Sequence, residues 1–421
     1  MEQIAGDLLQ TKYALDTLYF LIMGAFVMWM AAGFSMLEAG LVRSKNTAEI
    51  LTKNIVLYSV ACIMFMLVGY NIMYGDELTS LIPSIAFGLS GDNSTEVVLA
   101  GGEGAPYYST LSDFFFQVVF VATAMSIVSG AVAERMKLWA FLAFAMVFTA
   151  FIYPVEGMWK WGGGFLDQAG FLDFAGSGVV HMAGATAALA GVILLGARKG
   201  KYGKDGSVHA IPGANLPLAT LGTFILWMGW FGFNGGSELK VSDVAEANAT
   251  AMVFVNTNMA AAGGCVAALL LARAWFGKAD LTMALNGALA GLVSITAEPL
   301  TPSPEMATII GAIGGLLVVA SIVMIDRKIR LDDPVGAISV HGVVGVWGLL
   351  AVCLSNPEAS LGAQLLGIGM IFGWVFATSF VVWMAIKTLF GIRVSEEEEF
   401  EGMDVSECGL EAYPEFTQAR K

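Results

Sequence analysis

The chain has 421 residues, of which 57% are hydrophobic and only 13% are charged, and its formal net charge is −14. Soluble globular domains carry charge on roughly a quarter of their residues, so this composition excludes an ordinary soluble domain. The four cysteines are scattered without a CxxC spacing, and the sequence contains no metal triad, phosphate loop or nucleophile motif. We therefore expect no enzyme, no cofactor or bound metal, and no nucleic-acid partner.

Eleven apolar runs follow one another along the chain, most of them about 20 residues long, which is enough to cross a hydrocarbon core of roughly 30 Å. They are Thr17–Leu41, Lys53–Tyr74, Asp113–Val132, Leu138–Met158, Asp173–Ala197, Leu216–Gly235, Thr250–Trp275, Leu281–Ile295, Met306–Ile325, Ile338–Ser355 and Leu361–Leu389. A further run, Leu81–Leu89, is too short to span and contains Pro83, so we expect an outer loop or a half-buried segment there. The chain is predicted to be an all-α polytopic membrane protein, with a transmembrane domain over residues 1–390 and an acidic tail over residues 391–421.

The loops between these runs alternate in charge. Fourteen Lys and Arg residues fall in one set of loops, whereas the other set and the N-terminus together hold three. The richer set is Arg43, Lys45, Lys53, Arg135, Lys137, Arg198, Lys199, Lys201, Lys204, Arg273, Lys278, Arg327, Lys328 and Arg330. Because basic loops stay in the cytoplasm, we predict an outer N-terminus and a cytoplasmic C-terminus. One outer loop is acidic, which either concentrates cations there or simply keeps the loop soluble.

Two histidines lie in matching apolar segments, each eight residues after an aspartate: Asp173 with His181, and Asp333 with His341. A glycine follows each aspartate by three residues, and a valine precedes each histidine. At 1.5 Å per residue each histidine lies about 12 Å into the membrane, and the two segments start from opposite faces. Both side chains therefore reach the middle of the membrane. This geometry predicts an inverted repeat, with spans one to five mirrored by spans six to ten and one extra span.

Other interpretations of the histidines exist. A lone intramembrane histidine often serves only to hydrogen-bond a neighbouring helix. A zinc site is a poor alternative because two imidazoles lack a third ligand, and neither histidine sits in a nucleophile motif. The symmetry of the two segments favours a shared path through the membrane.

Several motifs, in order along nearly the whole chain, resemble those of the ammonium transporter (Amt/Rh) family, in particular its ammonium transporter branch. They are Gly33-Phe-Ser-Met-Leu-Glu-Ala-Gly40 with Arg43, Lys45 and Asn46, then Gly130-Ala-Val-Ala-Glu134-Arg135, Trp161-Gly-Gly-Gly164, Asp173-Phe-Ala-Gly176, Trp230-Phe-Gly-Phe233-Asn234-Gly-Gly-Ser237, and Asp332-Asp333-Pro334 leading to His341-Gly342.

The resemblance implies a homotrimer of eleven-helix subunits in the plasma membrane, each subunit with its own pore. It also implies roles for individual residues. The paired pore imidazoles are His181 and His341, the stacked aromatic gate is Phe120 and Phe233, and the outer recruitment site is Phe116, Phe120, Trp161 and Ser237, supported from behind by Asp173.

The expected activity is transport in which NH4+ is recruited outside, loses its proton and crosses as NH3, with net proton transfer. One alternative is an ammonium sensor that signals through its tail, and another is a neutral-gas channel of the Rhesus branch, which the aromatic and serine set disfavours. The acidic tail is either a solvated end or a contact for a neighbouring subunit or a PII-type regulator. Its Cys408-Gly409 stands where the family commonly has His-Gly.

Overall fold

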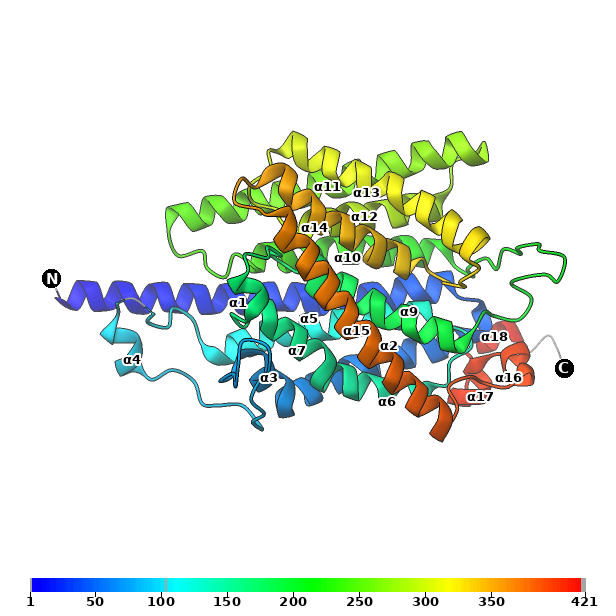
Figure 1. Ribbon diagram of the computed structural model, residues 1–421, viewed down its shortest axis with the longest axis horizontal. Coiled ribbons are helices and arrows are strands. Elements are labelled where there is room, and N and C mark those ends of the chain that lie inside the picture. Colours follow the sequence, from blue (N-terminus) through cyan, green and yellow to red (C-terminus); the bar gives the residue numbers. More distant parts are fainter. Residues whose placement is uncertain (1, 103, 418–421) are drawn as a thin grey trace.

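The structure is a computed structural model that describes residues 2–102 and 104–417, and in these ranges every extended regular element is a helix. Most helices run along the long axis of one bundle, with the two chain ends at opposite ends of it (Figure 1). The helices are α1 (Glu2–Leu41), α2 (Thr47–Met64), α3 (Tyr70–Tyr74), α4 (Thr95–Ala100), α5 (Thr110–Ala131), α6 (Leu138–Val147), α7 (Tyr153–Lys160), α8 (Phe165–Gln168), α9 (Ala183–Leu195), α10 (Leu216–Gly236), α11 (Val244–Phe276), α12 (Leu281–Thr296), α13 (Pro304–Met324), α14 (Val344–Ser355), α15 (Leu361–Leu389), α16 (Glu396–Glu401), α17 (Met403–Cys408) and α18 (Pro414–Thr417).

Short π-helical segments precede, interrupt or follow several of these helices, at Phe65–Gly69, Phe148–Ile152, Ser177–Met182, Ile325–Ile329 and Ile338–Val343, and a 3₁₀ turn covers Ser44–Asn46. Residues 75–94 form no regular helix, so the short run Leu81–Leu89 lies in a loop, as predicted. The all-helical membrane architecture predicted from the sequence is confirmed.

The predicted count of eleven spans is not confirmed. Within the described ranges, ten helical spans are long and apolar enough to cross a membrane. The helix at the eighth predicted position, α12, has 16 residues and so measures about 24 Å, less than a hydrocarbon core. All residues from Ala284 to Thr296 are buried, against α10, α11, α13 and α14 among others. Because this helix is surrounded by protein, its length is not set by the lipid thickness.

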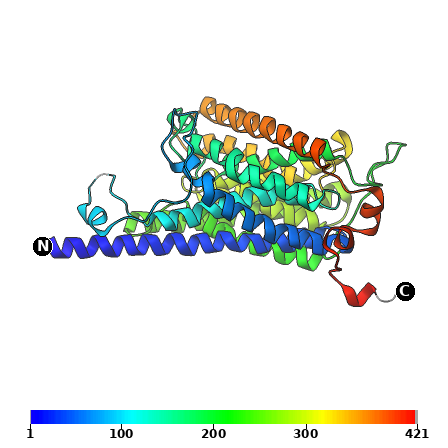
Figure 2. The same cartoon turned by 90° about the horizontal axis from the view of Figure 1, so that it is seen from below.

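The first helix is longer than predicted. α1 begins at Glu2, fifteen residues before the start expected at Thr17, and its first turns project beyond the bundle (Figure 2). Eight of the fifteen residues before Thr17 are Ala, Leu, Gln or Lys, which favour helix even where hydropathy is low. The buried carboxylate of Asp16 accepts a hydrogen bond from the Val241 backbone at 2.8 Å, and α4 packs on the projecting part.

A buried charge network joins the loops at the end of the bundle where residues 391–417 pack, which we call the tail face. Glu134 lies 2.8 Å from Arg43 and 3.2 Å from Arg198, and Arg198 pairs with Asp332 at 2.9 Å. Arg135 is fully buried and donates to the Asp332 carbonyl at 2.7 Å. Burial alone would raise the pKa of Asp332, but hydrogen bonds from Arg198 and the charge of Arg135 hold this pKa well below its usual range.

The tail residues are tied to the same face. Lys45 donates to the Glu399 carbonyl at 3.0 Å, and Arg393 contacts the Glu399 carboxylate at 2.6 Å. Asp404 accepts from the Glu49 backbone at 2.8 Å, so it caps the first turn of α2. The described tail is therefore a packed part of the subunit.

Candidate functional site

The two histidine segments have the same local structure. Oδ2 of Asp173 accepts from the backbone N–H of Gly178 at 2.9 Å, and Oδ2 of Asp333 accepts from that of Ile338 at 2.7 Å, each five residues on. Between aspartate and helix, Gly176 has φ 106° and Gly336 has φ 81°, values that favour glycine. In both segments a left-handed glycine and a capping carboxylate therefore start a π-helical turn that carries the histidine.

The two imidazoles meet in the interior of the bundle. Their Nδ1 atoms are 3.1 Å apart, and the ring centroids are 5.1 Å apart with an interplanar angle of 23°. His181 is fully buried and His341 is 4% exposed. His181 also stacks on Trp230 at 4.9 Å, and its Nε2 makes no hydrogen bond to any described residue. Segments 160 residues apart in the chain thus join in one polar contact.

A row of aromatic rings extends from His181 in the direction away from the tail face. Phe233 lies 5.3 Å from the His181 ring, and Phe120 lies 4.2 Å from Phe233. Phe120 also contacts Phe116 at 4.8 Å and meets Trp161 edge-on at 6.0 Å. The two phenylalanine rings predicted as a gate are therefore in contact, and they lie between the histidines and the rings of Phe116 and Trp161.

A pocket of about 260 Å³ opens on the far side of the phenylalanine pair, and we call it the outer pocket. It is lined by Tyr74, Tyr108, Asp113, Phe116, Gln117, Phe120, Trp161, Phe174, Ser237 and Leu239. The predicted residues Phe116, Phe120, Trp161 and Ser237 all belong to this lining. The hydroxyl of Ser237 donates to the Phe233 carbonyl at 2.8 Å, so its lone pairs remain free to accept from a ligand.

Asp173 lies behind this pocket and is not part of its lining. Its carbonyl accepts from Trp161 Nε1 at 3.0 Å, which fixes the indole ring, and its carboxylate caps the His181 segment. Asp173 instead lines a separate pocket of about 390 Å³ on another side of Trp161, together with Glu298. That Asp173 supports a recruitment site stays a prediction.

Sequence reasoning missed part of the outer pocket. Asp113, Gln117, Tyr74 and Tyr108 line it but were not among the predicted site residues. Asp113 and Gln117 lie three residues before Phe116 and Phe120, respectively, and so share their side of a helix. This spacing was the available signal, because a carboxylate at the start of an apolar run otherwise indicates only a helix end.

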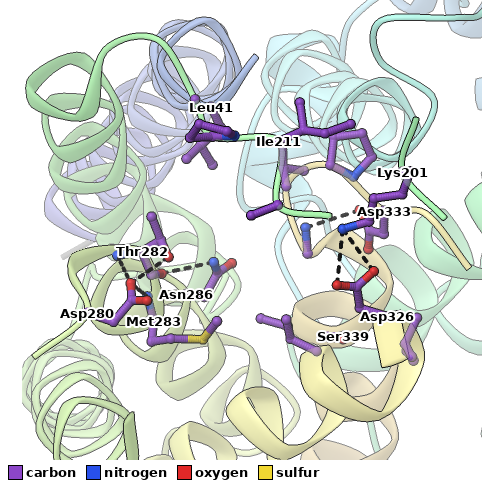
Figure 3. A pocket seen from close by; sticks show the side chains of 18 of the residues that line it. Leu41, Lys201, Ile211, Asp280, Thr282, Met283, Asn286, Asp326, Asp333 and Ser339 are labelled. Carbon is purple, nitrogen blue, oxygen red and sulfur yellow. Dashed lines mark hydrogen bonds and ion pairs between the residues drawn. The ribbon is translucent and has the colours of Figure 1, made fainter. Parts of the chain in front are cut away.

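Two cavities lie between the histidines and the tail face. The smaller, about 20 Å³, is bordered by His341, Phe34 and Glu38 among others. The larger, about 490 Å³, has a mixed lining of apolar, polar and charged side chains and opens among the loops of the tail face. Figure 3 shows Lys201 paired with Asp326 on one side of it, with Asp280 and Asn286 on the opposite wall. The outer pocket, the aromatic rings, the two histidines and these two cavities thus follow one another through the bundle.

The family assignment follows from comparison with known proteins. The model of the Ammonium Transporter Family matches residues 18–413. The chain belongs to this family. It is 41% identical to the ammonium transporter Amt2 of Archaeoglobus fulgidus, covering 95% of this chain and 88% of that protein. It is 32% identical to an ammonium transporter of Bacillus subtilis, covering 94% and 98%.

Solved structures of the family have the same fold. A protein described as a Sensor Amt Protein superposes with a TM-score of 0.86 at 36% identity, covering 94% of this chain and 99% of that one. Mep2 of Candida albicans superposes with a TM-score of 0.79 at 25% identity, covering 93% and 88%. The family consists of multi-pass membrane transporters rather than enzymes, and ammonium transport is the function it supports.

Proposed function

We propose that this ammonium transporter recruits NH4+ in the outer pocket, removes its proton there, and conducts NH3 past Phe120 and Phe233 and along the two histidines to the tail-face cavity. The observation that carries the proposal is the contact between His181 and His341, directly beneath the paired rings of Phe120 and Phe233. A pair of polar rings at the centre of an apolar bundle gives a small molecule hydrogen-bond partners at a depth where the apolar surroundings offer none.

The composition of the outer pocket suits a cation. Ring faces attract cations, and the attraction is worth about 2 kcal/mol or more when the site is desolvated. The lone pairs of Ser237 accept one N–H of ammonium, while its own proton is held by the Phe233 carbonyl. The aromatic side chains of Phe116, Phe120 and Trp161 supply the ring faces.

Beyond the pocket, losing the proton costs less than carrying the charge. The idealised cost of moving such an ion into an apolar interior is about 20 kcal/mol, with several kcal/mol left after relaxation. Deprotonating ammonium, whose aqueous pKa is about 9, costs roughly 3 kcal/mol at pH 7. Potassium has no proton to lose, so the same path excludes it.

Neutral imidazoles suit neutral ammonia. The 3.1 Å contact between two Nδ1 atoms requires one ring to donate and the other to accept, so this contact holds a single proton. We propose that the released proton also crosses, which makes transport electrogenic.

The membrane setting completes the proposal. We place the protein in the plasma membrane and its tail face on the cytoplasmic side, because the basic loops with Arg43, Arg135 and Arg198 gather there. Apolar side chains exposed on the bundle surface, such as Phe224 and Leu270, suit lipid or a neighbouring subunit of a homotrimer. The packed tail and the adjacent open cavity suit a PII-type regulator.

A test replaces both imidazoles. We expect His181→Ala with His341→Ala to reduce ammonium-evoked current by about 10-fold or more, or to let potassium through, because the polar partners along the path are lost. The measurement is current from purified protein in a supported bilayer, and His209→Ala in an exposed loop is the matched control. Unchanged current together with unchanged exclusion of potassium would refute the role of the pair.

The alternative is an ammonium sensor, favoured by one observation: a structure of high similarity is described as a sensor Amt protein. The described tail, ordered against the basic loops, offers a surface through which a signal could pass. The same bilayer experiment separates the two functions, since a sensor that does not transport gives no ammonium-evoked current from the wild-type protein.

A further inference from the structure

The outer pocket contains one carboxylate, that of Asp113. This residue lies in the first turns of α5 and is 8% exposed, and it forms part of the pocket lining. Tyr70 Oη donates to its Oδ2 at 2.6 Å, and Gln117 Nε2 donates to its Oδ1 at 3.1 Å. The two donors fix the orientation of the carboxylate. A carboxylate has about four acceptor positions, so each oxygen keeps capacity for another donor.

This carboxylate has no cationic side chain beside it. Among the ion pairs of residues 2–102 and 104–417, none involves Asp113, and both of its side-chain hydrogen bonds come from neutral groups. Buried acidic side chains are rarely left without a counter-charge, because desolvation is expensive. The remaining space that Asp113 faces is the pocket.

The other walls of the pocket favour the same kind of ligand. Six aromatic side chains line it: Tyr74, Tyr108, Phe116, Phe120, Trp161 and Phe174. Ring faces attract cations and repel anions. An aromatic cage with one fixed, unpaired carboxylate is therefore a complete site for a small cation with N–H donors, since the carboxylate supplies the full charge that Ser237 and the rings lack.

We propose that Asp113 is the counter-ion of the recruited cation and a determinant of its affinity. This inference rests on the proposed function and goes beyond it, because it adds direct charge recognition to the aromatic and serine contacts. A charge-assisted hydrogen bond is stronger than a neutral one. The carboxylate thus holds ammonium in the pocket before its proton is lost.

A purely structural role for Asp113 makes a different prediction. If the carboxylate only anchors Tyr70, then removing the Tyr70 hydroxyl should have the same effect as neutralising Asp113. If it binds the cation, Tyr70→Phe keeps the charge and frees an acceptor position, so affinity should be kept or rise. The Tyr70 side chain itself is not part of the pocket lining.

The test measures ammonium-evoked current against ammonium concentration for the full chain in bilayers. Asp113→Asn should raise the half-saturating concentration about 10-fold to 100-fold, with a smaller change in maximal current. Asp113→Glu should restore most of the affinity, and Asp76→Asn, the same charge change on an exposed outer loop, should shift it by less than about 2-fold.

A second measurement uses tetramethylammonium, which carries a permanent charge and has no proton to lose. It should compete with ammonium in the wild-type protein, and its inhibition constant should rise in Asp113→Asn by a factor similar to that for ammonium. An unchanged half-saturating concentration in Asp113→Asn, or an equal loss in Tyr70→Phe, would overturn the inference while leaving the transport proposal intact. Absence of current in the wild-type protein would instead overturn the proposed function.

Discussion

The Asp173–His181 and Asp333–His341 segments share one local design but face different surroundings. Each has a capping aspartate, a left-handed glycine and a π-helical turn with the histidine. Beside the first segment lie stacked aromatic rings and the outer pocket. Beside the second lie the buried charges around Asp332 and the open tail-face cavity.

Two segments of the same local structure can therefore have different surroundings on the two sides of the bundle. The matched segments bring the two imidazoles into contact, whereas the residues packed around each segment determine which ligands that side of the bundle attracts. Aromatic rings and one carboxylate suit a cation in the outer pocket, and under the proposed function the open cavity that contains Lys201 and Asp326 suits release at the other end. Substitutions on each side should therefore have unequal effects.

The largest effect on stability is expected on the charged side. Asp332→Asn removes the bidentate counter-charge of the buried Arg198 and leaves Glu134, 3.2 Å away, as its remaining ion pair, which should cost about 3 kcal/mol in the free energy of unfolding. Thermal unfolding of the purified protein measures this cost. Asp326→Asn removes the more exposed pair with Lys201 and should cost less than about 1 kcal/mol, so equal losses in the two variants would contradict the assignment.

The same aspartate predicts an acid limit. Because the folded-state pKa of Asp332 is depressed, its contribution to stability is complete well above the unfolded value of about 3.9 and is lost as pH falls below it. Unfolding measured from pH 7 to pH 3 should show wild-type stability falling more steeply than that of Asp332→Asn. If the stabilities of the two proteins fell in parallel with pH, Asp332 would not be the source of the acid limit.

The two left-handed glycines offer a closer comparison. Alanine at either position costs about 1–2 kcal/mol for the backbone alone. At Gly176 the added Cβ would also meet Val180 at 2.7 Å and the Trp161 ring at 3.0 Å, whereas at Gly336 the nearest atoms are 3.3 Å away. Gly176→Ala should therefore destabilise more and also reduce ammonium current by displacing Trp161. Stability and current assays of both variants test this order.

The smallest effect is expected from pH at the outer end. Burial and a hydrogen bond shared with Glu246 raise the pKa of Glu238, next to Ser237, to about 7. As pH rises from 6 to 8 this side chain ionises, so the outer end gains a negative charge and the half-saturating ammonium concentration should fall about 2-fold. Ammonium itself stays almost fully protonated over this range. Glu238→Gln should abolish this change in the half-saturating concentration. If the change persisted in the variant, a group other than Glu238 would be responsible.

Much of this arrangement could be predicted because membranes impose simple rules. Hydropathy located the spans, and the matched spacing of Asp173 with His181 and Asp333 with His341 anticipated that the histidines meet. The short α12 could not be distinguished from a full span, since its burial by other helices depends on tertiary packing. The early start of α1 was missed because helix propensity, not hydropathy, sets it.

One physical reason explains why sequence analysis missed the remaining contacts. The place of Asp113 in the pocket depends on Tyr70, 43 positions away, and on rings from other helices, so its spacing to Phe116 alone was too weak a signal. The tail was expected as a solvated end or an external contact, and the structure instead packs Glu399 and Asp404 onto loops more than 190 positions earlier in the chain. Contacts of this range are decided by the assembled bundle.

The bond between the two Nδ1 atoms of His181 and His341 has one more consequence. Only one hydrogen fits between them, so the tautomer of one ring dictates that of its partner. The imidazoles therefore act as a single bistable element, and reversing its polarity requires both rings to rearrange together.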